Sequence, residues 1–220
     1  MGFICQRPNY WIINISLYNY LKMELVAGVD EVGRGSLIGP VYAAAVILNK
    51  KINRNELKDS KKLNKNQREN LAKYIKKNSI WAIGSASAKE IEKINILNAS
   101  LLAMKRAIKK LNKKPNLVLV DGNKSPTIEN CLIKTIIKGD QKIPEISAAS
   151  IIAKVSRDKL MLNMSKKFKN YKWDLNAGYG TKDHIRAIKK FGVTKFHRKK
   201  FKPIHKILSH HKNQSLKEIY

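Results

Sequence analysis

The order of apolar and polar positions along the chain predicts an α/β protein, because β-branched runs alternate with segments of helical period. The predicted strands cover residues 26–32, 41–48, 80–88, 117–120 and 132–137. The predicted helices cover residues 67–77, 89–94, 97–111, 144–168, 181–191 and 203–208. Gly33, Gly35, Gly39 and Pro40 interrupt the apolar pattern between the first two strands, so we expect the chain to reverse direction there.

This pattern fits one domain with no internal repeat and no long linker. We expect that domain to cover residues 23–195, and residues 196–220 to form a basic C-terminal helix and tail that packs on it. Residues 1–22 do not continue the pattern. We therefore expect them to be a disordered extension, and one hypothesis is that they are mis-assigned and that Met23 is the natural start.

The charge of the chain indicates that the protein has a polyanionic partner. Lys and Arg number 45 against 16 Asp and Glu, which gives a formal charge of +29 and a pI of about 10.1. Nucleic acid is the usual partner of so basic a protein. The lysines are spread along the whole chain, however, so the charge by itself does not locate an interface.

Cysteine usage and hydropathy indicate where the protein works. The two cysteines, Cys5 and Cys131, have no metal-binding spacing, which favours a reduced cytoplasmic protein without a disulfide framework. The apolar stretch 10–21 is too short to span a bilayer and has no clear signal-peptide cleavage site. We expect a monomer that has no membrane partner.

Four acidic residues fall at the ends of three predicted strands. Asp30 and Glu31 end the first strand, Asp121 follows the run 117–120, and Asp140 follows the strand 132–137. Each of them alone could be a solvated turn residue. If these strands are neighbours, however, the four carboxylates meet at one edge of the sheet, where open α/β sheets bind their ligands.

Clustered carboxylates repel one another and raise each other's pKa values unless cations neutralise them. Divalent ions such as Mg²⁺ prefer carboxylate oxygens. Two such ions, about 3.5–4 Å apart, support in-line displacement at phosphorus. Combined with the basic charge, this arrangement predicts metal-assisted hydrolysis of a phosphodiester in nucleic acid.

Two further segments have two interpretations each, and a third has one. Asp59-Ser60-Lys61-Lys62 is either a helix cap or a phosphate-binding turn. The aromatic and glycine-rich stretch 171–180 either anchors a loop in the core or stacks on sugars and bases. On the long helix, Lys154, Arg157 and Asp158 stand at a spacing that predicts a salt-bridged cluster.

Eight short blocks occur in a fixed order: AGVDEVGRG (27–35), DSKKL (59–63), NILNAS (95–100), VDGN (120–123), KGD (138–140), PEISAASIIAKVSRD (144–158), GYGT (178–181) and HRKKF (197–201). With these blocks the chain resembles the ribonuclease HII family, the type 2 ribonucleases H. The resemblance extends over about residues 24–208. Residues 1–22 have no counterpart in the usual family pattern.

The resemblance implies an RNase H-like fold, in which helices flank a five-stranded mixed sheet. It also implies an endonuclease that cuts the RNA strand of RNA/DNA hybrids and cuts 5′ to single ribonucleotides in duplex DNA. The products would carry 3′-OH and 5′-phosphate ends, which suits removal of ribonucleotides from DNA. The implied cofactors are two Mn²⁺ or Mg²⁺ ions.

The resemblance also assigns roles to residues. The implied metal-binding catalytic acids are Asp30, Glu31, Asp121 and Asp140. Gly33, Arg34 and Gly35 would contact the 2′-OH and adjacent phosphates, Tyr179 would lie against the sugar of the next deoxynucleotide, and Ser60 and Lys61 would hold backbone phosphates. The chain departs from the family pattern at Asn176-Ala177, where His-Lys is common, and at Lys200, where Ser is usual.

Two rival functions keep part of this pattern. A non-catalytic, basic nucleic-acid-binding protein would explain the charge but not the four strand-end acids. Another two-metal nuclease on the same fold, acting on DNA, would explain the acids but not the Gly-Arg-Gly and Tyr179 set. Metal-dependent turnover separates the first from a ribonuclease H, and choice of substrate separates the second.

Overall fold

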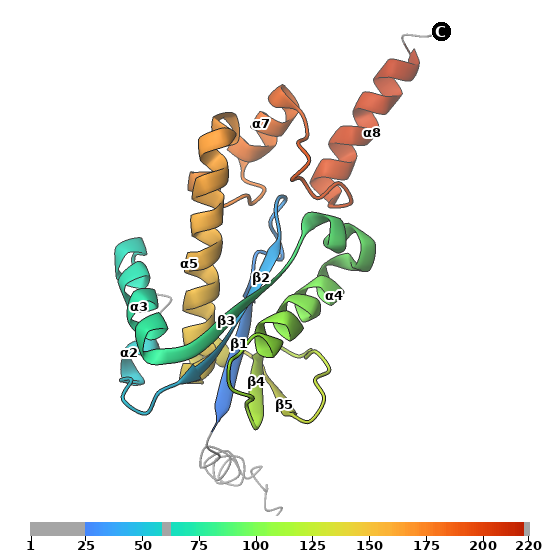
Figure 1. Ribbon diagram of the computed structural model, residues 1–220. Coiled ribbons are helices and arrows are strands. Elements are labelled where there is room, and N and C mark those ends of the chain that lie inside the picture. The colour runs from blue at the N-terminus through green and yellow to red at the C-terminus, as the bar shows by residue number, and fades with distance from the viewer. Residues whose placement is uncertain (1–24, 59–62, 218–220) are drawn as a thin grey trace, which may run out of the picture.

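The computed structural model describes residues 25–58 and 63–217 of the chain, and in this part five strands form one mixed sheet (Figure 1). The spatial order is β3-β2-β1-β4-β5. The strands are β1 (Val26–Val32), β2 (Val41–Leu48), β3 (Ser79–Ala86), β4 (Leu117–Asp121) and β5 (Leu132–Ile136). The predicted fold class and all five predicted strands are confirmed, with small shifts of their ends.

The pairing of the strands explains why the acids share an edge. β1 and β2 are antiparallel, as the predicted reversal requires, and β2 pairs with β3 in the same way. β1 and β4 are parallel, and so are β4 and β5. The C-terminal ends of β1, β4 and β5 therefore lie at the same edge of the sheet.

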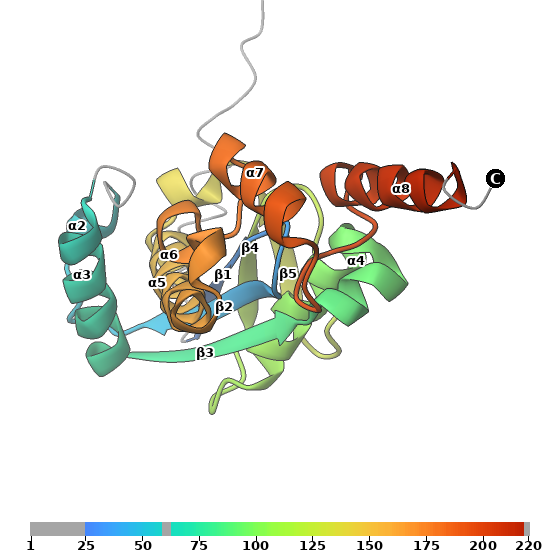
Figure 2. The same cartoon turned by 90° about the horizontal axis from the view of Figure 1, so that it is seen from above.

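Helices cover both faces of this sheet. The described helices are α2 (Asn55–Lys58), α3 (Lys65–Asn78), α4 (Ala88–Lys109), α5 (Pro144–Lys167), α6 (Trp173–Asn176), α7 (Lys182–Phe191) and α8 (Lys202–Lys217), with short 3₁₀ turns at Gly139–Gln141 (η2) and Lys169–Tyr171 (η3). α4 lies on one face, and α3 and α5 lie on the other (Figures 1 and 2). No helix in the described ranges is both long and apolar enough to cross a membrane.

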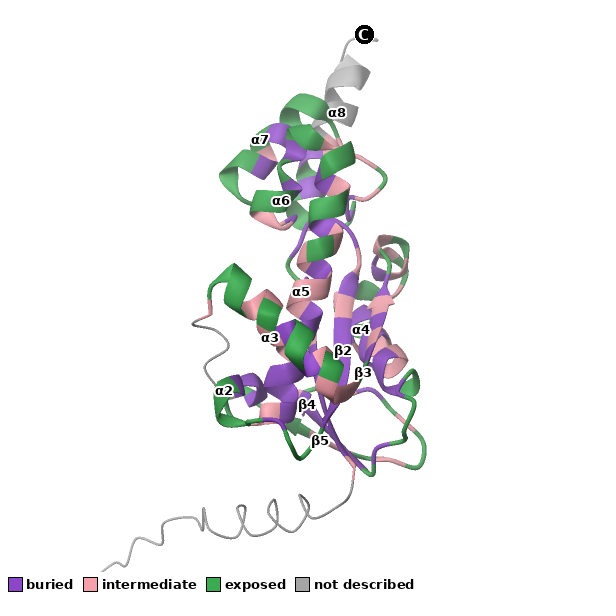
Figure 3. Ribbon diagram, turned by 60° about the vertical axis from the view of Figure 1, so that its left-hand side comes forward, coloured by how far each residue is buried: buried purple, intermediate pink, exposed green. Residues whose placement is uncertain are grey.

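Alternate residues of β2 divide the apolar core between these two faces, because successive side chains of a strand point in opposite directions. Ala43, Ala45 and Ile47 pack with α4. Ala44, Val46 and Leu48 pack with the helices of the other face, α2, α3 and α5. Figure 3 shows the result, with buried residues along the sheet and exposed residues on the outer sides of the helices.

The start of α5 lies directly on β1. A Cβ atom added to Gly28 would stand 2.0 Å from the carbonyl carbon of Glu145 and 2.2 Å from the amide nitrogen of Ile146. Only glycine allows this approach of helix backbone to strand backbone. The contact brings the first turns of α5 beside the strand that carries Asp30 and Glu31.

A second apolar cluster, which we call the distal core, lies at the far end of α5. It contains Leu37, Ile38, Met161, Tyr171, Trp173, Ala187, Ile188, Ile204 and Ile207. These residues come from the loop after β1, from α5, and from the segments η3, α6, α7 and α8. The distal core therefore joins the C-terminal segments to the loop that follows the acids of β1.

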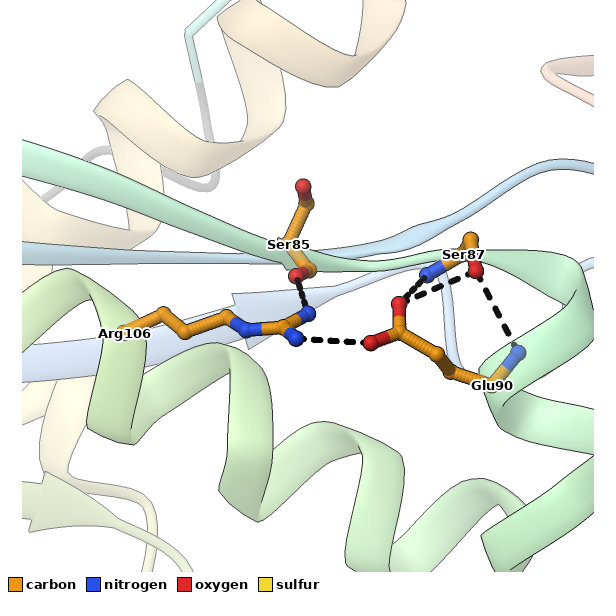
Figure 4. Close-up of polar contacts among 4 residues, drawn as sticks. All are labelled: Ser85, Ser87, Glu90 and Arg106. Atoms are coloured by element: carbon orange, nitrogen blue, oxygen red, sulfur yellow. Dashed lines mark hydrogen bonds and ion pairs between the residues drawn. The ribbon is translucent and has the colours of Figure 1, made fainter.

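The element α4 has a break at Asn95 (φ 65°, ψ 169°) that divides it into two helical segments, which confirms the prediction of two helices there. The Asn95 side chain accepts a hydrogen bond from the Asn98 amide at 3.0 Å and so caps the second half. At the start of α4, Ser87 and Glu90 form a reciprocal capping box, and Glu90 also pairs with Arg106 at 2.6 Å (Figure 4). Hydrogen bonds from Arg106 and Ser87 lower the pKa of Glu90 to about 2.

One predicted cluster on α5 is wrong in part. Lys154 does pair with Asp158, at 2.7 Å. Arg157 instead turns inward, is fully buried, and donates to main-chain carbonyl groups of other segments. Helical spacing places all three residues near one another, but tertiary packing decides which side chain leaves the helix surface.

Candidate active site

The C-terminal edge of the central strands carries the first group of site residues. Asp30 and Glu31 lie near the end of β1, and Asp121 is the last residue of β4. The parallel register pairs Val29 with Val120, so Asp30 and Asp121 are each one position further along neighbouring strands. The charges of Glu31 and Asp121 both raise the pKa of Asp30, which places the three carboxylates within electrostatic range of one another.

Asp30 is the most strongly perturbed of these acids. Its side chain is buried, accepts a hydrogen bond from the Glu31 amide at 2.7 Å, and accepts another from the Ser150 hydroxyl on α5. Burial raises its pKa to about 8, with Glu31 and Asp121 adding to the rise. A carboxylate in this position needs a nearby cation to be ionised at neutral pH.

For Glu31, the guanidinium group of Arg34 is the nearby cation. Arg34 Nη1 lies 3.2 Å from Glu31 Oε1, and the Glu31 side chain is only 12% exposed, against 50% for Arg34. Burial raises the pKa of Glu31, and Arg34 opposes that rise. The ion pair thus links the acidic edge to the Gly-Arg-Gly loop.

Asp140 is positioned by a tight turn after β5. Lys138 adopts a left-handed conformation (φ 56°), and η2 follows it. The Gly139 amide donates a hydrogen bond to Asp121 Oδ1 at 2.7 Å, and Asp140 is buried beside it. The segment that carries Asp140 is therefore attached directly to the carboxylate of Asp121.

The chemistry of this edge fits a hard divalent cation, since it offers several carboxylate oxygens close together and burial raises the pKa of Asp30 and of Glu31. Within residues 25–58 and 63–217, however, no group of three or more acidic, His or Cys side chains could by itself enclose a metal ion. Mg²⁺ usually keeps several water ligands and takes few from protein. The four-carboxylate metal site stays a prediction.

The second group of site residues forms a continuous surface beside the acids. The segment after Gly35 pairs with the segment around Tyr179 through a β-bridge between Ser36 and Tyr179 and a 2.8 Å hydrogen bond from the Leu37 amide to the Gly178 carbonyl. A Cβ atom on Gly35 would stand 3.8 Å from Tyr179 Cε1. The structure therefore brings the Gly-Arg-Gly loop and the Tyr179 ring together.

His184 holds the main chain of Tyr179. Trp173 Nε1 donates to His184 Nε2 at 3.0 Å, so Nε2 accepts and the proton of the neutral imidazole lies on Nδ1. Nδ1 then donates to the Tyr179 carbonyl at 2.8 Å. Burial lowers the pKa of His184, which keeps this neutral form at physiological pH. Sequence reasoning did not single out His184, since its role depends on a contact made only in the folded chain.

A cavity near β4 and β5 is not part of this site. It has a volume of about 320 Å³ and is lined by residues that include Ile108, Leu111, Ile128 and Cys131. Leu111 and Cys131 precede β4 and β5, so the cavity lies by the N-terminal ends of these strands, away from Asp121. Ser60 and Lys61, the predicted phosphate contacts, lie outside the described residues.

Comparison with known proteins now bears on this arrangement. The family model "Ribonuclease HII" matches residues 27–204. The chain belongs to the ribonuclease HII family. A ribonuclease HII of Pelagibacter ubique is 70% identical over 186 residues, which are 84% of this chain and 100% of that protein. The protein is thus a ribonuclease H, a metal-dependent endonuclease that hydrolyses phosphodiester bonds.

Solved structures support the same fold. The ribonuclease H2 of Pyrococcus horikoshii superposes with a TM-score of 0.71 at 28% identity, covering 84% of this chain and 98% of that one. Bst-RNase HIII in complex with Mn²⁺ superposes with a TM-score of 0.68 at 16% identity, covering 94% and 75% of the two chains. At that identity, the second likeness shows the fold alone.

Two of the residues where this ribonuclease HII departs from the usual family pattern have internal partners for their side chains. Asn176 donates to the Tyr171 carbonyl at 2.7 Å and accepts from the Gly178 amide at 2.8 Å, which shapes the turn before Tyr179. Lys200 donates to the Glu92 carbonyl on α4 at 2.8 Å. Both side chains thus contribute to the local structure around the site.

Proposed function

We propose that this protein cuts the RNA strand of RNA/DNA hybrids and cuts 5′ to single ribonucleotides in duplex DNA, leaving 3′-OH and 5′-phosphate ends. Its role would be to begin the removal of ribonucleotides from DNA, as a monomer in the cytoplasm. The observation that carries the proposal is the position of Tyr179 against Gly35, directly beside the acidic edge of β1 and β4.

In this proposal, Asp30, Glu31, Asp121 and Asp140 hold two divalent ions, either Mg²⁺ or Mn²⁺. When bound, such ions lower the pKa of an attacking water and neutralise charge on the leaving oxygen. The raised pKa of Asp30, about 8, supports a cation at this place, because only a cation would keep the buried carboxylate ionised at neutral pH.

The protein's own groups orient the acids before substrate arrives. The Ser150 hydroxyl and the Glu31 amide hold Asp30, and the Gly139 amide holds Asp121. Hydrogen bonds of this kind to ligating carboxylates fix their direction and raise the affinity of the site. Arg34 neutralises Glu31 and, being half exposed, also lies within reach of a substrate phosphate.

The surface formed by the Gly-Arg-Gly loop and Tyr179 would recognise the ribonucleotide. Backbone groups of Gly33, Arg34 and Gly35 would contact the 2′-OH and the adjacent phosphates, since the 2′-OH is the group that distinguishes RNA from DNA. The Tyr179 ring would lie against the sugar of the following deoxynucleotide. Ser60 and Lys61 would hold backbone phosphates further along the strand.

The decisive experiment is cleavage of an end-labelled DNA duplex that contains one ribonucleotide, with Mg²⁺, Mn²⁺ or chelator, beside an all-DNA duplex of the same sequence. We expect a metal-dependent nick 5′ to the ribonucleotide and no nick in the control duplex. Binding without any cut would favour a non-catalytic nucleic-acid-binding protein. Cutting of the all-DNA control would favour a general two-metal nuclease.

A further inference from the structure

Two buried arginines lie beneath the Gly-Arg-Gly loop, and the mechanism above assigns them no role. The side chains of Arg157 and Arg198 are both fully buried. Among the described ion pairs, neither guanidinium has a carboxylate partner. A buried charge without an ion-pair partner is costly, so its presence calls for a reason beyond packing.

Arg157 connects the two recognition segments. Its Nη1 donates to the Ala177 carbonyl at 2.9 Å, two residues before Tyr179, and its Nη2 donates to the Ile38 carbonyl at 3.4 Å on the opposite segment. The guanidinium carbon lies 5.6 Å from the centre of the Tyr179 ring. A Cβ atom on Gly33 (φ +91°) would stand 2.2 Å from Arg157 Nε, so this glycine rests on the guanidinium.

Arg198 holds the loop from its other side. Its Nη1 donates to the Arg34 carbonyl at 2.8 Å, and its Nε donates to the Gly39 carbonyl at 3.0 Å. The side chain of Arg34 meets Glu31, so Arg198 is one residue removed from the acidic edge. Nη2 of Arg198 is buried and has no hydrogen-bond partner among the described residues.

We propose that Arg157 and Arg198 are positioning residues for the proposed cleavage. Arg157 sets the distance between the Gly-Arg-Gly loop and the Tyr179 ring. This distance decides how strongly a ribonucleotide–deoxynucleotide junction is preferred over a continuous hybrid. Arg198 holds the loop itself, which both substrates need. This inference rests on the proposed function, because it concerns the choice between its two substrates.

The guanidinium group suits this task better than an ammonium group. Its planar fork can donate to carbonyl groups in two directions at once, and it also stacks on aromatic rings. Burial and the charge of Arg157 lower the pKa of Arg198 to about 9, which leaves it positively charged at neutral pH. Two such charges under a loop that faces phosphates would attract the substrate backbone.

The test compares kcat/KM on a duplex with one ribonucleotide and on a fully ribonucleotide-containing hybrid. Lysine keeps the charge but lacks the planar fork that donates in two directions, so Arg157→Lys should lower the first by about tenfold or more, while the second falls by less than about threefold. Arg198→Lys should lower both to a similar degree. Arg186→Lys is the matched control, since Arg186 makes an exposed pair with Asp183, and it should change neither.

Equal losses on the two substrates for Arg157→Lys, or no loss, would overturn the proposal. Circular dichroism and thermal melting show whether each variant folds, and Arg157→Gln, which keeps a planar donor, replaces the lysine variant if that one does not. A double variant with Tyr179→Ala adds a second reading: Arg157→Lys should then have no further effect on the substrate ratio. If the wild-type protein cuts neither substrate, the proposed function fails rather than this inference.

Discussion

The amide of Gly139 donates a 2.7 Å hydrogen bond to the carboxylate of Asp121. This contact joins the end of β4 to the turn after β5, and Asp140 is the next residue of that turn. Two of the four candidate ligands are thereby held by one backbone group. The orientation of Asp121 consequently does not depend on its charge, which allows the charge to be removed without loss of the local structure.

We expect Asp121→Asn to lower cleavage by roughly a thousandfold, because bound metal ions contribute several kcal/mol to such reactions and this ligand would lose its charge. Asparagine keeps an oxygen that can accept from Gly139, so binding of hybrid should stay near the wild-type level. Cleavage of labelled hybrid and a gel-shift titration measure the two effects. Asp183→Asn, on the exposed surface of α7, serves as control, and near-wild-type turnover by Asp121→Asn would refute the assignment.

The raised pKa of Asp30 has a consequence for stability. The folded protein holds a proton on this group up to pH about 8, whereas the unfolded chain releases it near 3.8. The folded state therefore binds more protons in that window, and the free energy of unfolding falls as pH rises through it. In the presence of chelator, Asp30→Asn should remove this loss and stabilise the protein at pH 8 by about 1–3 kcal/mol.

Bound divalent ions should oppose this loss of stability at high pH in the wild-type protein. A cation that binds the ionised carboxylate of the folded state alone raises stability by mass action. Thermal melting with Mn²⁺ should thus show a larger stabilisation at pH 8 than at pH 5, and Asp30→Asn should show little at either. A metal response that does not change with pH would contradict this account of the site.

Removal of the Tyr179 ring should impair junction cleavage more than metal binding. Stacking on an aromatic side chain is worth about 1–3 kcal/mol, so Tyr179→Ala should reduce cutting at a single ribonucleotide by about tenfold. Tyr179→Phe keeps the ring and should retain most activity. Calorimetric titration with Mn²⁺ provides the independent check, and undiminished junction cleavage by Tyr179→Ala would rule out this role.

The capping box of α4 supports a prediction about stability alone. Ser87→Ala removes the hydroxyl that accepts from the Glu90 amide at 3.2 Å. Loss of such a cap costs about 0.5–2 kcal/mol of unfolding free energy, which urea denaturation would measure. Cleavage activity should not change, since none of the side chains in this network belongs to the candidate active site (Figure 4).

Local sequence patterns predicted the sheet well, because apolar runs indicate strands and glycines indicate the turns between them. The run 117–120 followed by Asp121 indicates a buried strand that ends in a carboxylate, and the register of β1 and β4 follows from that fold. Even the cap of α7 at Thr181 was predictable, since hydroxyl side chains satisfy free amides at helix starts.

The buried arginines were not predictable in this way. Arg157 stands at a spacing that suits a pair with Asp158, and only the approach of Ile38 and Ala177, which are far away in sequence, draws it inward. Leu97 shows the converse, because it is an apolar residue of the predicted helix 97–111 but is 37% exposed after the break at Asn95. Both outcomes depend on long-range packing rather than on local preference.

One helix, α5, connects the acidic edge of the sheet to the segment that carries Tyr179. Ser150 of α5 bonds to Asp30, and Arg157 of the same helix bonds to the carbonyl group of Ala177, two residues before Tyr179. Seven residues of helix amount to two turns and about 10 Å. In the proposed cleavage, α5 would therefore fix the distance between the bond that is cut and the sugar that Tyr179 contacts. Inserting a single residue between positions 150 and 157 would rotate the two ends of this segment by about 100° relative to each other. In the proposed cleavage, the position of the cut would then no longer be set by the contact of Tyr179 with the sugar.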